Sequence, residues 1–385
     1  MSISQSSLPC SIKARLIAFY LPQFHPIPEN DQWWGKGFTE WTNVGKAKPL
    51  FPGHDQPRVP ADLGYYDLRV QETRIAQAEL AQKYGVEAFC YWHYWFGGGR
   101  RLLEKPFNEV LQDKEPNFPF CLAWANQTWS GIWHGSPDKV LIRQTYPGIE
   151  DYQNHFYALL EAFGDHRYLT VEGKPLFVVY SPLALPIPRE FTDCWRDLAA
   201  QSGLKGLYIV GMTKDPSWNP EANGFDASTI PNPDYLFSER SIRISLKRTL
   251  PEKIYKKALK LLNKELHDQK YPKLPTLFSY EKAIECAFIK NNLEFENYPC
   301  IFPNWDNSPR SGVNGRVFLD STPELFRLHL LDALKQVASK SHEKRIIFIK
   351  AWNEWAEGNY LEPDQKWGKA YLEVIKDEVF SKEGL

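Results

Sequence analysis

The sequence predicts an α/β fold, a (β/α)8 barrel of the TIM type, and two observations carry this prediction. First, short apolar, β-branched or aromatic runs recur along the whole chain, each bounded by polar or turn residues. They lack the strict alternation of a half-exposed strand, as buried parallel strands do. Second, helical patterns such as 71–84 and 323–339 separate several of these runs. Eight parallel strands joined by helical crossovers close into a barrel, and a doubly wound open sheet is the alternative.

The expected strands follow one another along the chain at residues 15–24, 86–96, 118–126, 175–181, 206–212, 225–230, 299–305 and 346–355. Between the sixth and seventh strands lies a stretch, 236–295, that is too long for an ordinary barrel loop. It carries 13 Lys and Arg against 7 Asp and Glu. Its apolar residues at 254, 255, 258, 261 and 262 follow helical spacing with lysines between them. We therefore expect one domain, residues 1–385, with a basic, partly helical insertion at 236–295.

Two interpretations of this insertion remain open. It is either a solvated helical excursion packed on the barrel rim, or a surface that docks to an anionic membrane or an acidic glycan. The N-terminus lacks the apolar core of a signal peptide, and no 18 apolar residues run together. We expect a cytoplasmic protein, with peripheral contact to the inner face of the membrane through the insertion as the second interpretation.

Composition narrows the class of function. Aromatic residues make up 15% of the chain and include 14 Trp, whose flat apolar face and single N–H donor suit sugar-binding platforms. A formal net charge of −1 argues against nucleic-acid binding. The six cysteines are widely spaced and form no C-x-x-C pair, and no His, Asp and Glu cluster has the spacing of metal ligands. We expect an oligosaccharide or polysaccharide partner, with no metal and no cofactor.

Polar and aromatic residues gather where the expected strands end, the face that carries the active site in barrel enzymes. The first strand is followed by GFTEW, the second ends in YWHYW and the third runs into WANQTW. The seventh ends in NWDN and the eighth in WNEWAEG. Core packing is the alternative for each of these side chains. The candidate substrate-binding residues are Glu40, Trp41, Trp92, His93, Trp95, Trp124, Asn126, Trp129, Asn304, Trp305, Asp306, Trp352, Asn353 and Trp355.

Glu354 and Glu357 are the candidate catalytic residues. Cleaving or forming a glycosidic bond needs one group that moves a proton at the bridging oxygen and a second that manages charge at the anomeric carbon. Among Trp352, Trp355 and Tyr360, apolar surroundings raise the pKa of one carboxyl. On a helical turn their spacing puts the β-carbons about 5–6 Å apart, nearer the roughly 5–5.5 Å carboxyl separation of retaining enzymes than the roughly 6.5–9.5 Å of inverting ones.

These residues also carry a family resemblance. The segment WNEWAEG at 352–358 resembles the E-W-x-E-G signature of glycoside hydrolase family 99, the endo-α-mannosidases. The segments AFYLPQFH at 18–25, GFTEW at 37–41, FCYWHYW at 89–95 and LAWAN at 122–126 more closely resemble the WbsX-like proteins of bacterial surface-polysaccharide gene clusters. The resemblance spans nearly the whole chain.

The resemblance implies a (β/α)8 barrel that acts on α-linked sugars without a metal or organic cofactor. In the mannosidase family the substrate's own 2-hydroxyl is the nucleophile, which gives a 1,2-anhydro sugar intermediate and net retention. Carried over by motif position, Glu354 deprotonates that hydroxyl, and Glu357 protonates the leaving oxygen and then activates water. The implied enzyme is a retaining, endo-acting glycoside hydrolase on mannose- or rhamnose-like bacterial surface polysaccharide or its precursor.

The main alternative is a glycosyltransferase of O-antigen, lipopolysaccharide or capsule biosynthesis, since WbsX-like proteins have also been given that label. Nucleotide-sugar transferases usually show a phosphate-binding doubly wound fold or a D-x-D metal site, and the chain contains neither G-x-G-x-x-G nor D-x-D. The segment GGGRR at 97–101 is a candidate phosphate cradle and equally an ordinary loop. A non-catalytic glycan-binding module is a third class, and the presence of both carboxylates argues against it.

Overall fold

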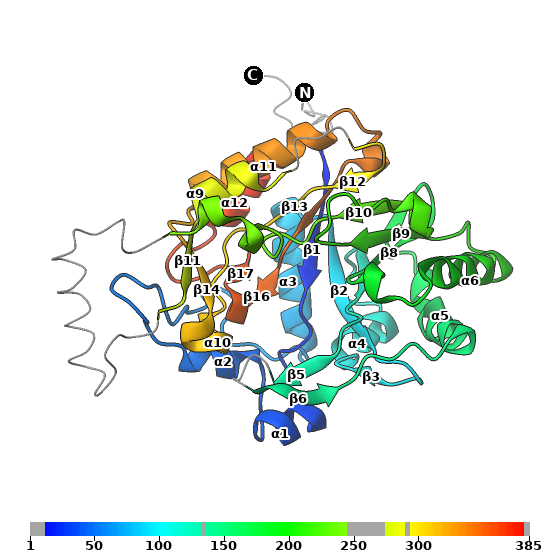
Figure 1. The fold of residues 1–385 in the computed structure, drawn as a ribbon, viewed down its shortest axis with the longest axis horizontal. Helices are drawn as coiled ribbons and strands as arrows, with labels where there is room; N and C mark the ends of the chain where they lie inside the picture. The colour runs from blue at the N-terminus through cyan, green and yellow to red at the C-terminus, as the bar shows by residue number, and fades with distance from the viewer. Residues whose placement is uncertain (1–11, 132–135, 245–273, 289–292, 381–385) are drawn as a thin grey trace, which may run out of the picture.

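A parallel sheet occupies the centre of the protein (Figure 1). The computed structural model describes residues 12–131, 136–244, 274–288 and 293–380. The strands of the sheet are β1 (Arg15–Tyr20), β2 (Ala88–Trp95), β4 (Phe120–Trp124), β8 (Lys174–Val179), β9 (Tyr208–Met212), β10 (Ala227–Thr229), β12 (Asn297–Tyr298), β13 (Cys300–Ile301) and β15 (Ile346–Ile349). Their neighbour order is β12-β10-β9-β8-β4-β2-β1-β15-β13.

The two ends of this order meet at Pro299. β12 pairs in parallel with β10, and β13 pairs in parallel with β15, so the strand segments on either side of this single proline join both edges of the sheet. The Pro299 carbonyl accepts a hydrogen bond from the Phe348 backbone N–H at 2.9 Å, which continues the ladder across the break. The sheet is therefore a closed barrel in which β12 and β13 act as one seventh strand.

Each of the eight expected strand ranges overlaps a strand of this barrel, so the predicted fold class is confirmed and the open-sheet alternative is excluded. The expected helices 71–84 and 323–339 are α3 (Gln71–Lys83) and α11 (Pro323–Val337). All six residues of β1 are buried, because the barrel interior covers one face of the strand and the outer helices cover the other. Burial on both faces explains the apolar runs without alternation.

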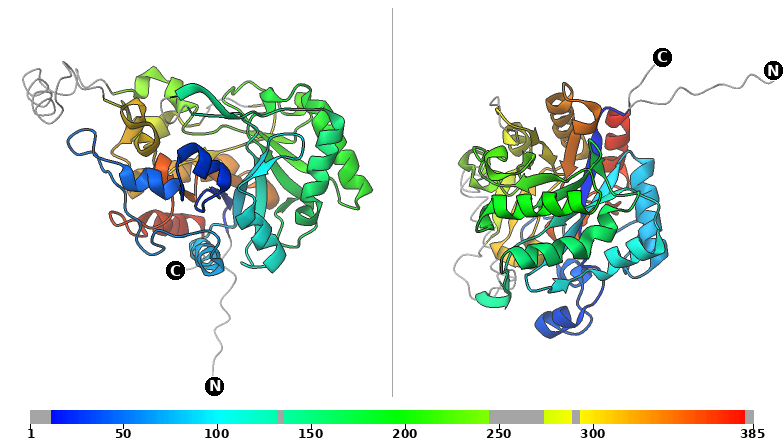
Figure 2. Two further views of the ribbon diagram at one scale, coloured as in Figure 1. Left: turned by 90° about the horizontal axis from the view of Figure 1, so that it is seen from below. Right: turned by 90° about the vertical axis from the view of Figure 1, so that its right-hand side faces the viewer.

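The helices divide into an outer layer and a group at the mouth of the barrel (Figures 1 and 2). The outer layer includes α3, α4 (Lys105–Asp113), α5 (Ile149–Phe163), α6 (Pro188–Gln201), α9 (Tyr280–Cys286), α11 and α12 (Ala370–Val379). At the end where the strands finish lie α1 (Pro28–Trp34), α2 (Glu40–Lys46), α10 (Ser308–Ser311) and the antiparallel hairpin of β5 (Trp129–Gly131) and β6 (Ser136–Ile142). This mouth is the end at which barrel enzymes build their active sites.

Short strand pairs complete the described fold. β3 (Arg101–Leu102) pairs with β2, and β7 (Thr170–Val171) pairs with β8. β11 (Thr276–Ser279) pairs in parallel with β14 (Arg316–Leu319), and β16 (Asn353–Glu354) pairs antiparallel with β17 (Asn359–Tyr360). The last of these pairs stands at the mouth of the barrel; it contains Glu354, and the turn between its two strands contains Glu357.

The predicted insertion at 236–295 is described only in part. Its apolar positions at 254, 255, 258, 261 and 262 lie outside the described residues. The described segments pack as a second apolar cluster beside the barrel, which includes Leu236, Ile242, Tyr280 and Trp305. Within the described ranges, no helix has the length and apolar character needed to cross a membrane.

Candidate active site

The segment after β15 forms a tight turn that carries both candidate catalytic residues. Asn353 fixes its start, because its Oδ1 accepts from the Leu21 backbone N–H at 2.7 Å and its Nδ2 donates to the Leu21 carbonyl at 3.1 Å. The turn runs from Glu354 in β16 through a 3₁₀ turn, η8 (Trp355–Glu357), into β17. The end of the last barrel strand is thereby tied to the end of the first.

Gly358 ends this turn, and the position requires glycine. Its φ of +68° is in the left-handed region that side chains disfavour. A Cβ there would lie 2.7 Å from the Asp306 backbone nitrogen. That nitrogen in turn donates to the Glu357 carbonyl at 2.6 Å. The close approach of two loops thus depends on the missing side chain.

Glu354 is buried and faces two cationic side chains and a tryptophan. The Trp92 Nε1–H donates to its Oε1 at 3.0 Å. Burial alone raises the pKa of Glu354, but the neighbouring Glu357 carboxyl, the charges of Lys350 and Arg310, and the Trp92 hydrogen bond together hold its pKa below the ordinary value. Glu354 is therefore an ionised carboxylate near neutral pH.

Glu357 lies in the opposite protonation state. Burial, and then the negative charge of Glu354, raise its pKa well above the ordinary value, against the positive charges of Arg310 and Lys350. The Arg310 Nη1 donates to Glu357 Oε1 at 2.5 Å, whereas Oε2 is buried with no donor from outside the carboxyl pair among the described residues, and a side-chain hydrogen bond links Glu357 to Glu354. The pair thus holds one proton between two carboxyls, and Oε2 of Glu357 is the oxygen free to carry it.

Two further acidic groups, Glu40 and Asp234, complete the electrostatics. Arg310 also donates through Nε to Glu40 Oε2 at 3.1 Å, and Glu40 Oε1 accepts from Gln23 Nε2 at 3.2 Å. Lys350 Nζ lies 3.1 Å from Asp234 Oδ2. Burial disfavours the charge of Lys350, yet Asp234 and the other acidic groups hold its pKa well above the ordinary value. The site is a buried network of paired charges.

Both carboxyls line a cavity of about 690 Å³ at the mouth of the barrel. This volume lies within the usual range for ligand pockets, about 300–1,000 Å³. Aromatic rings and amides surround it, as sugar recognition requires. Six of the predicted site residues contribute to its lining: Glu40, Trp92, Asn126, Trp129, Glu354 and Glu357.

Three of the predicted sugar ligands point to the outside of the barrel. His93 and Trp95 alternate along β2 with Trp92 and Tyr94, which line the cavity. The His93 ring nitrogen Nε2 lies 2.8 Å from that of His155, and Trp95 Nε1 donates to Asp151 at 3.1 Å, so both side chains contact α5. Trp124 is also buried beside α5, 4.9 Å from the His155 ring. Successive strand residues face opposite sides of a sheet, so a run of aromatic residues at a strand end cannot line one cavity as a block.

Four other predicted ligands support the catalytic turn from behind. Trp41 donates to the Tyr66 carbonyl at 2.7 Å, and Trp355 stacks on Tyr360 with ring centroids 3.8 Å apart. Trp352 is fully buried against Phe89. With Asn353, which clamps Leu21, these residues lie outside the lining of the cavity.

The three predicted residues after β13 also lie outside that lining. Trp305 packs under Lys350, whose Nζ is 5.0 Å from the ring centroid. Asn304 borders a separate cavity of about 340 Å³ and accepts a hydrogen bond from Ser321. Asp306 is fully buried, with its carboxylate bonded to protein groups.

Sequence reasoning missed Arg310 and Lys350. Arg310 lies in a short polar segment, 307–316, whose spacing shows no pattern, so nothing in the sequence marks it. Lys350 did carry a signal, because it is a single charge within the apolar run IIFIKAW at 346–352. A buried lysine in such a run needs a partner. Among the described residues, no group of three or more His, Cys, Asp or Glu is arranged to hold a metal ion.

The fold is a (β/α)8 barrel with two buried carboxyls in a cavity at its mouth. The family model described as "Glycosyltransferase WbsX" matches residues 16–375, and the chain belongs to this WbsX family. A relative, "Uncharacterized protein WxcX" from Xanthomonas campestris pv. campestris strain B100, is 37% identical over 373 residues, which cover 96% of this chain and 50% of the relative. The corresponding protein of a second strain, ATCC 33913, is also 37% identical, again over 96% of this chain. The chain thus spans half the length of the curated relatives it matches.

Solved structures share the fold at low sequence identity. A "Glycoside hydrolase-like protein" superposes with a TM-score of 0.57 at 15% identity over 98% of each chain. The family 99 endo-α-mannosidase from Bacteroides thetaiotaomicron, in complex with bis-tris-propane, superposes with a TM-score of 0.50 at 16% identity, over 94% of this chain and 95% of the other. At these identities the likeness shows the barrel fold alone.

Proposed function

We propose that the chain is a retaining, endo-acting glycoside hydrolase for an α-linked, mannose- or rhamnose-like bacterial surface polysaccharide or its precursor. The observation that carries the proposal is the split protonation of two buried carboxyls in one cavity. Glu354 is ionised and Glu357 holds a proton, for the reasons of burial and charge given above. One base and one acid at a single reacting centre are what glycoside cleavage requires.

In the first step of the proposed mechanism, Glu354 removes the proton of the sugar's 2-hydroxyl. The 2-oxygen then attacks the anomeric carbon, and the bond from that carbon to the bridging oxygen breaks. Glu357 donates its proton to the leaving oxygen, which departs as a hydroxyl. The product of this step is a 1,2-anhydro sugar, with Glu354 protonated and Glu357 ionised.

Water completes the reaction in the second step. Glu357, now a base, removes a proton from water, whose oxygen attacks the anomeric carbon and opens the anhydro ring. Glu354 returns its proton to the 2-oxygen. Two displacements at the same carbon give net retention, and both carboxyls end in their starting states. Arg310 and Lys350 stabilise the ionised carboxyl at each stage, because their charges lie beside both groups.

Aromatic residues around the carboxyls supply the proposed sugar contacts. Trp92 lies against Phe19 with centroids 4.7 Å apart, and Trp129 packs edge-on against Tyr94 at 5.0 Å. Asn126 is fixed by its Oδ1, which accepts from the Ser181 backbone N–H at 2.8 Å. Trp92, Trp129 and Asn126 border the cavity beside Glu354, and we assign them to substrate binding together with Glu40.

Transfer to a sugar hydroxyl in place of water is the second candidate, and the description of the family as "Glycosyltransferase WbsX" favours it. The same carboxyl pair serves this reaction if an acceptor hydroxyl replaces water in the second step. A phosphate cradle at 97–101 is less well supported, because the Gly98 backbone N–H already donates to Asp151 Oδ1 at 2.7 Å. An incoming phosphate would have to displace that carboxylate.

We place this activity in the cytoplasm, in O-antigen, lipopolysaccharide or capsule biosynthesis. Peripheral contact with the membrane through the basic insertion belongs to the same proposal. The charge of 236–295, with 13 basic against 7 acidic residues, supports the membrane contact. Cosedimentation with vesicles of anionic and of neutral lipid at two salt concentrations tests the membrane contact, because electrostatic binding weakens with salt.

Mass spectrometry of reaction products tests the main proposal. A panel of α-linked bacterial oligosaccharides is incubated with the wild type and with Glu357→Gln, each with and without sugar nucleotides. Shortened chains without a nucleotide, absent with the variant, support hydrolysis. Extension only with a nucleotide supports the transferase and contradicts the hydrolytic mechanism.

A further inference from the structure

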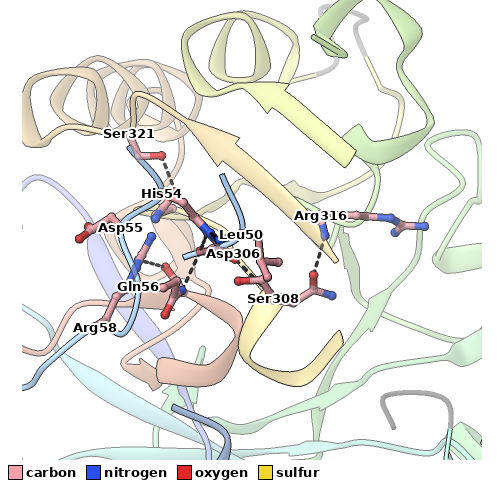
Figure 3. Close-up of polar contacts among 12 residues, drawn as sticks. Leu50, His54, Asp55, Gln56, Arg58, Asp306, Ser308, Arg316 and Ser321 are labelled. Carbon is pink, nitrogen blue, oxygen red and sulfur yellow. Dashed lines mark hydrogen bonds and ion pairs between the residues drawn. The ribbon is translucent and has the colours of Figure 1, made fainter. Parts of the chain in front are cut away.

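Asp306 is the point at which three loops at the barrel mouth meet (Figure 3). Its Oδ2 accepts from His54 Nε2 at 2.9 Å and from Gln56 Nε2 at 2.7 Å, and its Oδ1 accepts from the Ser308 backbone N–H at 3.0 Å. Its own backbone N–H donates to the Glu357 carbonyl at 2.6 Å. Asp306, in the loop after β13, therefore binds the loop that follows α2, the start of α10 and the catalytic turn.

These contacts connect Asp306 to both Glu357 and its partner Arg310. Ser308 begins α10, and Arg310 lies two residues further along that helix. Glu357 is held through its carbonyl, while Arg310 holds its carboxyl. The relative position of the arginine and the acid is thus set through Asp306.

The hydrogen-bond pattern at His54 fixes the direction of these bonds. Its Nδ1 accepts from the Leu50 backbone N–H at 3.0 Å, so Nε2 carries the hydrogen and donates to Asp306. The Phe51 ring stacks on the imidazole at 4.4 Å. Arg58 donates to the Gly358 carbonyl at 3.1 Å, and its charge, after the His54 bond, helps to hold the pKa of Asp306 below the ordinary value despite burial. Asp306 is a buried carboxylate surrounded by donors of the protein itself.

We propose that Asp306, held by His54 and Gln56, is a positioning residue that sets the contact between Arg310 and Glu357. This role rests on the proposed function, because Asp306 would affect catalysis only through Glu357, the proposed acid. It replaces the sugar contact that the sequence suggested for Asp306, since the side chain is 0% exposed and both of its oxygens accept protein hydrogen bonds.

The first test measures the titration of Glu357 in the free protein, without any substrate. Carboxyl signals of protein labelled with [5-13C]glutamate are followed by NMR against pH, and Glu357→Gln assigns the signal. In Asp306→Asn one of the two accepting oxygens becomes an amide nitrogen, so either the His54 and Gln56 donors or the Ser308 backbone N–H lose their acceptor, and the link between the loop after α2 and α10, which carries Arg310, is loosened. We expect the midpoint of Glu357 to move to higher pH, because the contacting guanidinium that lowers its pKa is displaced. An unchanged midpoint overturns the proposal.

A charge-conserving swap separates positioning from sugar binding. Asp306→Asn combined with Gln56→Glu exchanges the carboxylate and the amide across the same 2.7 Å contact. We expect the double variant to return the Glu357 midpoint toward the wild-type value, because the buried charge and the bond between loops are restored. If the midpoint stays where Asp306→Asn alone puts it, the proposal is wrong.

Two further variants guard against loss of folding. Asp165→Asn removes another carboxylate that is buried and bonded to an arginine, Arg167 at 2.9 Å, far from the catalytic turn in sequence and contacts. It should lower the melting temperature and leave the Glu357 midpoint unchanged. If Asp306→Asn does not fold, Gln56→Met removes one donor and leaves Asp306 charged. It must then move the midpoint upward, or the proposal fails.

Turnover adds a readout that depends on the proposed function. On any oligosaccharide that the wild type cleaves, we expect Asp306→Asn to lower kcat roughly 10- to 100-fold, the usual scale for groups that orient a catalytic residue, with little change in KM. In an Arg310→Gln background, Asp306→Asn should lower kcat much less, because both substitutions act on the same contact between Arg310 and Glu357. Equal losses in the two backgrounds contradict the proposal. If Glu357→Gln retains turnover, the proposed function fails, whereas the titration result stands by itself.

Discussion

Arg310 binds Glu357 through Nη1 at 2.5 Å. The same guanidinium binds Glu40 through Nε at 3.1 Å, so one arginine joins helix α2 to the catalytic turn. Because it occupies Oε1 of Glu357, the proton of that carboxyl lies on Oε2. The Arg310 guanidinium thus determines which oxygen of Glu357 carries the proton, and Glu357 stays protonated.

Replacing Arg310 with glutamine tests this arrangement through pH. Its charge lowers the pKa of both Glu357 and Glu354, so its loss should raise both. An acid with a higher pKa stays protonated up to a higher pH, and a carboxylate base with a higher pKa becomes ionised only at a higher pH. The whole bell-shaped profile of kcat against pH should therefore move to higher pH. Arg196→Gln, which breaks an ion pair with Asp226 outside the site, should leave the profile in place.

Glu357→Gln should lose turnover and keep sugar binding. The amide preserves shape but cannot donate the proton, and general acid catalysis typically contributes about 10²–10⁴-fold. The loss should shrink for an activated aryl glycoside, whose leaving group departs without protonation. Binding is measured by calorimetry and turnover with both substrates. Because Glu357 is also the proposed base of the second step, the comparison uses release of the leaving group in the first turnover, and an equal loss there with both substrates would show that Glu357 is not the acid.

Trp92→Phe should change the acidic side of the pH profile. The variant keeps an aromatic ring beside Phe19 but removes the 3.0 Å hydrogen bond that lowers the pKa of Glu354. The base then ionises at higher pH, so activity at low pH should fall. Trp129→Phe is the matched control, because Trp129 lines the same cavity and packs edge-on against Tyr94. It should raise KM and leave the acidic limb unchanged.

Gly358→Ala should destabilise the protein more than Gly53→Ala does. Both glycines have positive φ, +68° and +81°, so both alanines carry the same kind of backbone strain, about 1–2 kcal/mol. Only at Gly358 would the new Cβ meet backbone, 2.7 Å from the Asp306 nitrogen, whereas Gly53 has open space around it. The difference in unfolding free energy from urea titrations measures the cost of this contact. Equal losses would show that the two loops separate freely.

The sequence was sufficient for the barrel because the signal for each strand is local. Apolar runs such as 346–349 are buried on both faces, and a set of eight such strands closes into a barrel. The catalytic turn could also be predicted, since Glu354 and Glu357 lie three residues apart in one motif. The break at Pro299 was not predicted, because the two halves of that strand pair with different partners.

The lining of the cavity could be predicted only in part, because strand-end residues divide between two faces. Trp92 borders the cavity and His93 contacts α5, although they are adjacent in the sequence. The side of the sheet that a residue faces depends on register, which a continuous apolar run does not reveal. Arg310 reaches Glu40 across 270 residues, and only the closed fold brings such groups together.

Glu362 gives the protein a pH dependence of stability that is separate from catalysis. It is buried behind the catalytic turn, where Trp355 Nε1 and the Tyr66 hydroxyl donate to its carboxyl at 2.6 and 2.8 Å. Burial raises its pKa to about 7. As pH rises, Glu362 therefore loses its proton at a lower pH in the unfolded chain, where its pKa is about 4.3, than in the folded protein. Between about pH 4 and pH 7 the folded state binds more protons, so stability falls as pH rises, and the contribution is constant above about pH 7.

Glu362→Gln tests this contribution, because glutamine resembles the protonated acid at every pH. At about 1.4 kcal/mol per pKa unit, the wild type should lose on the order of 3 kcal/mol from this group between pH 4 and pH 8. Because the variant does not titrate at this position, its stability relative to the wild type should rise by on the order of 3 kcal/mol between pH 4 and pH 8. Urea unfolding at pH 5, 6, 7 and 8 measures the difference. A gap that stays constant with pH would show that Glu362 is ionised throughout and that its three hydrogen-bond donors outweigh its burial.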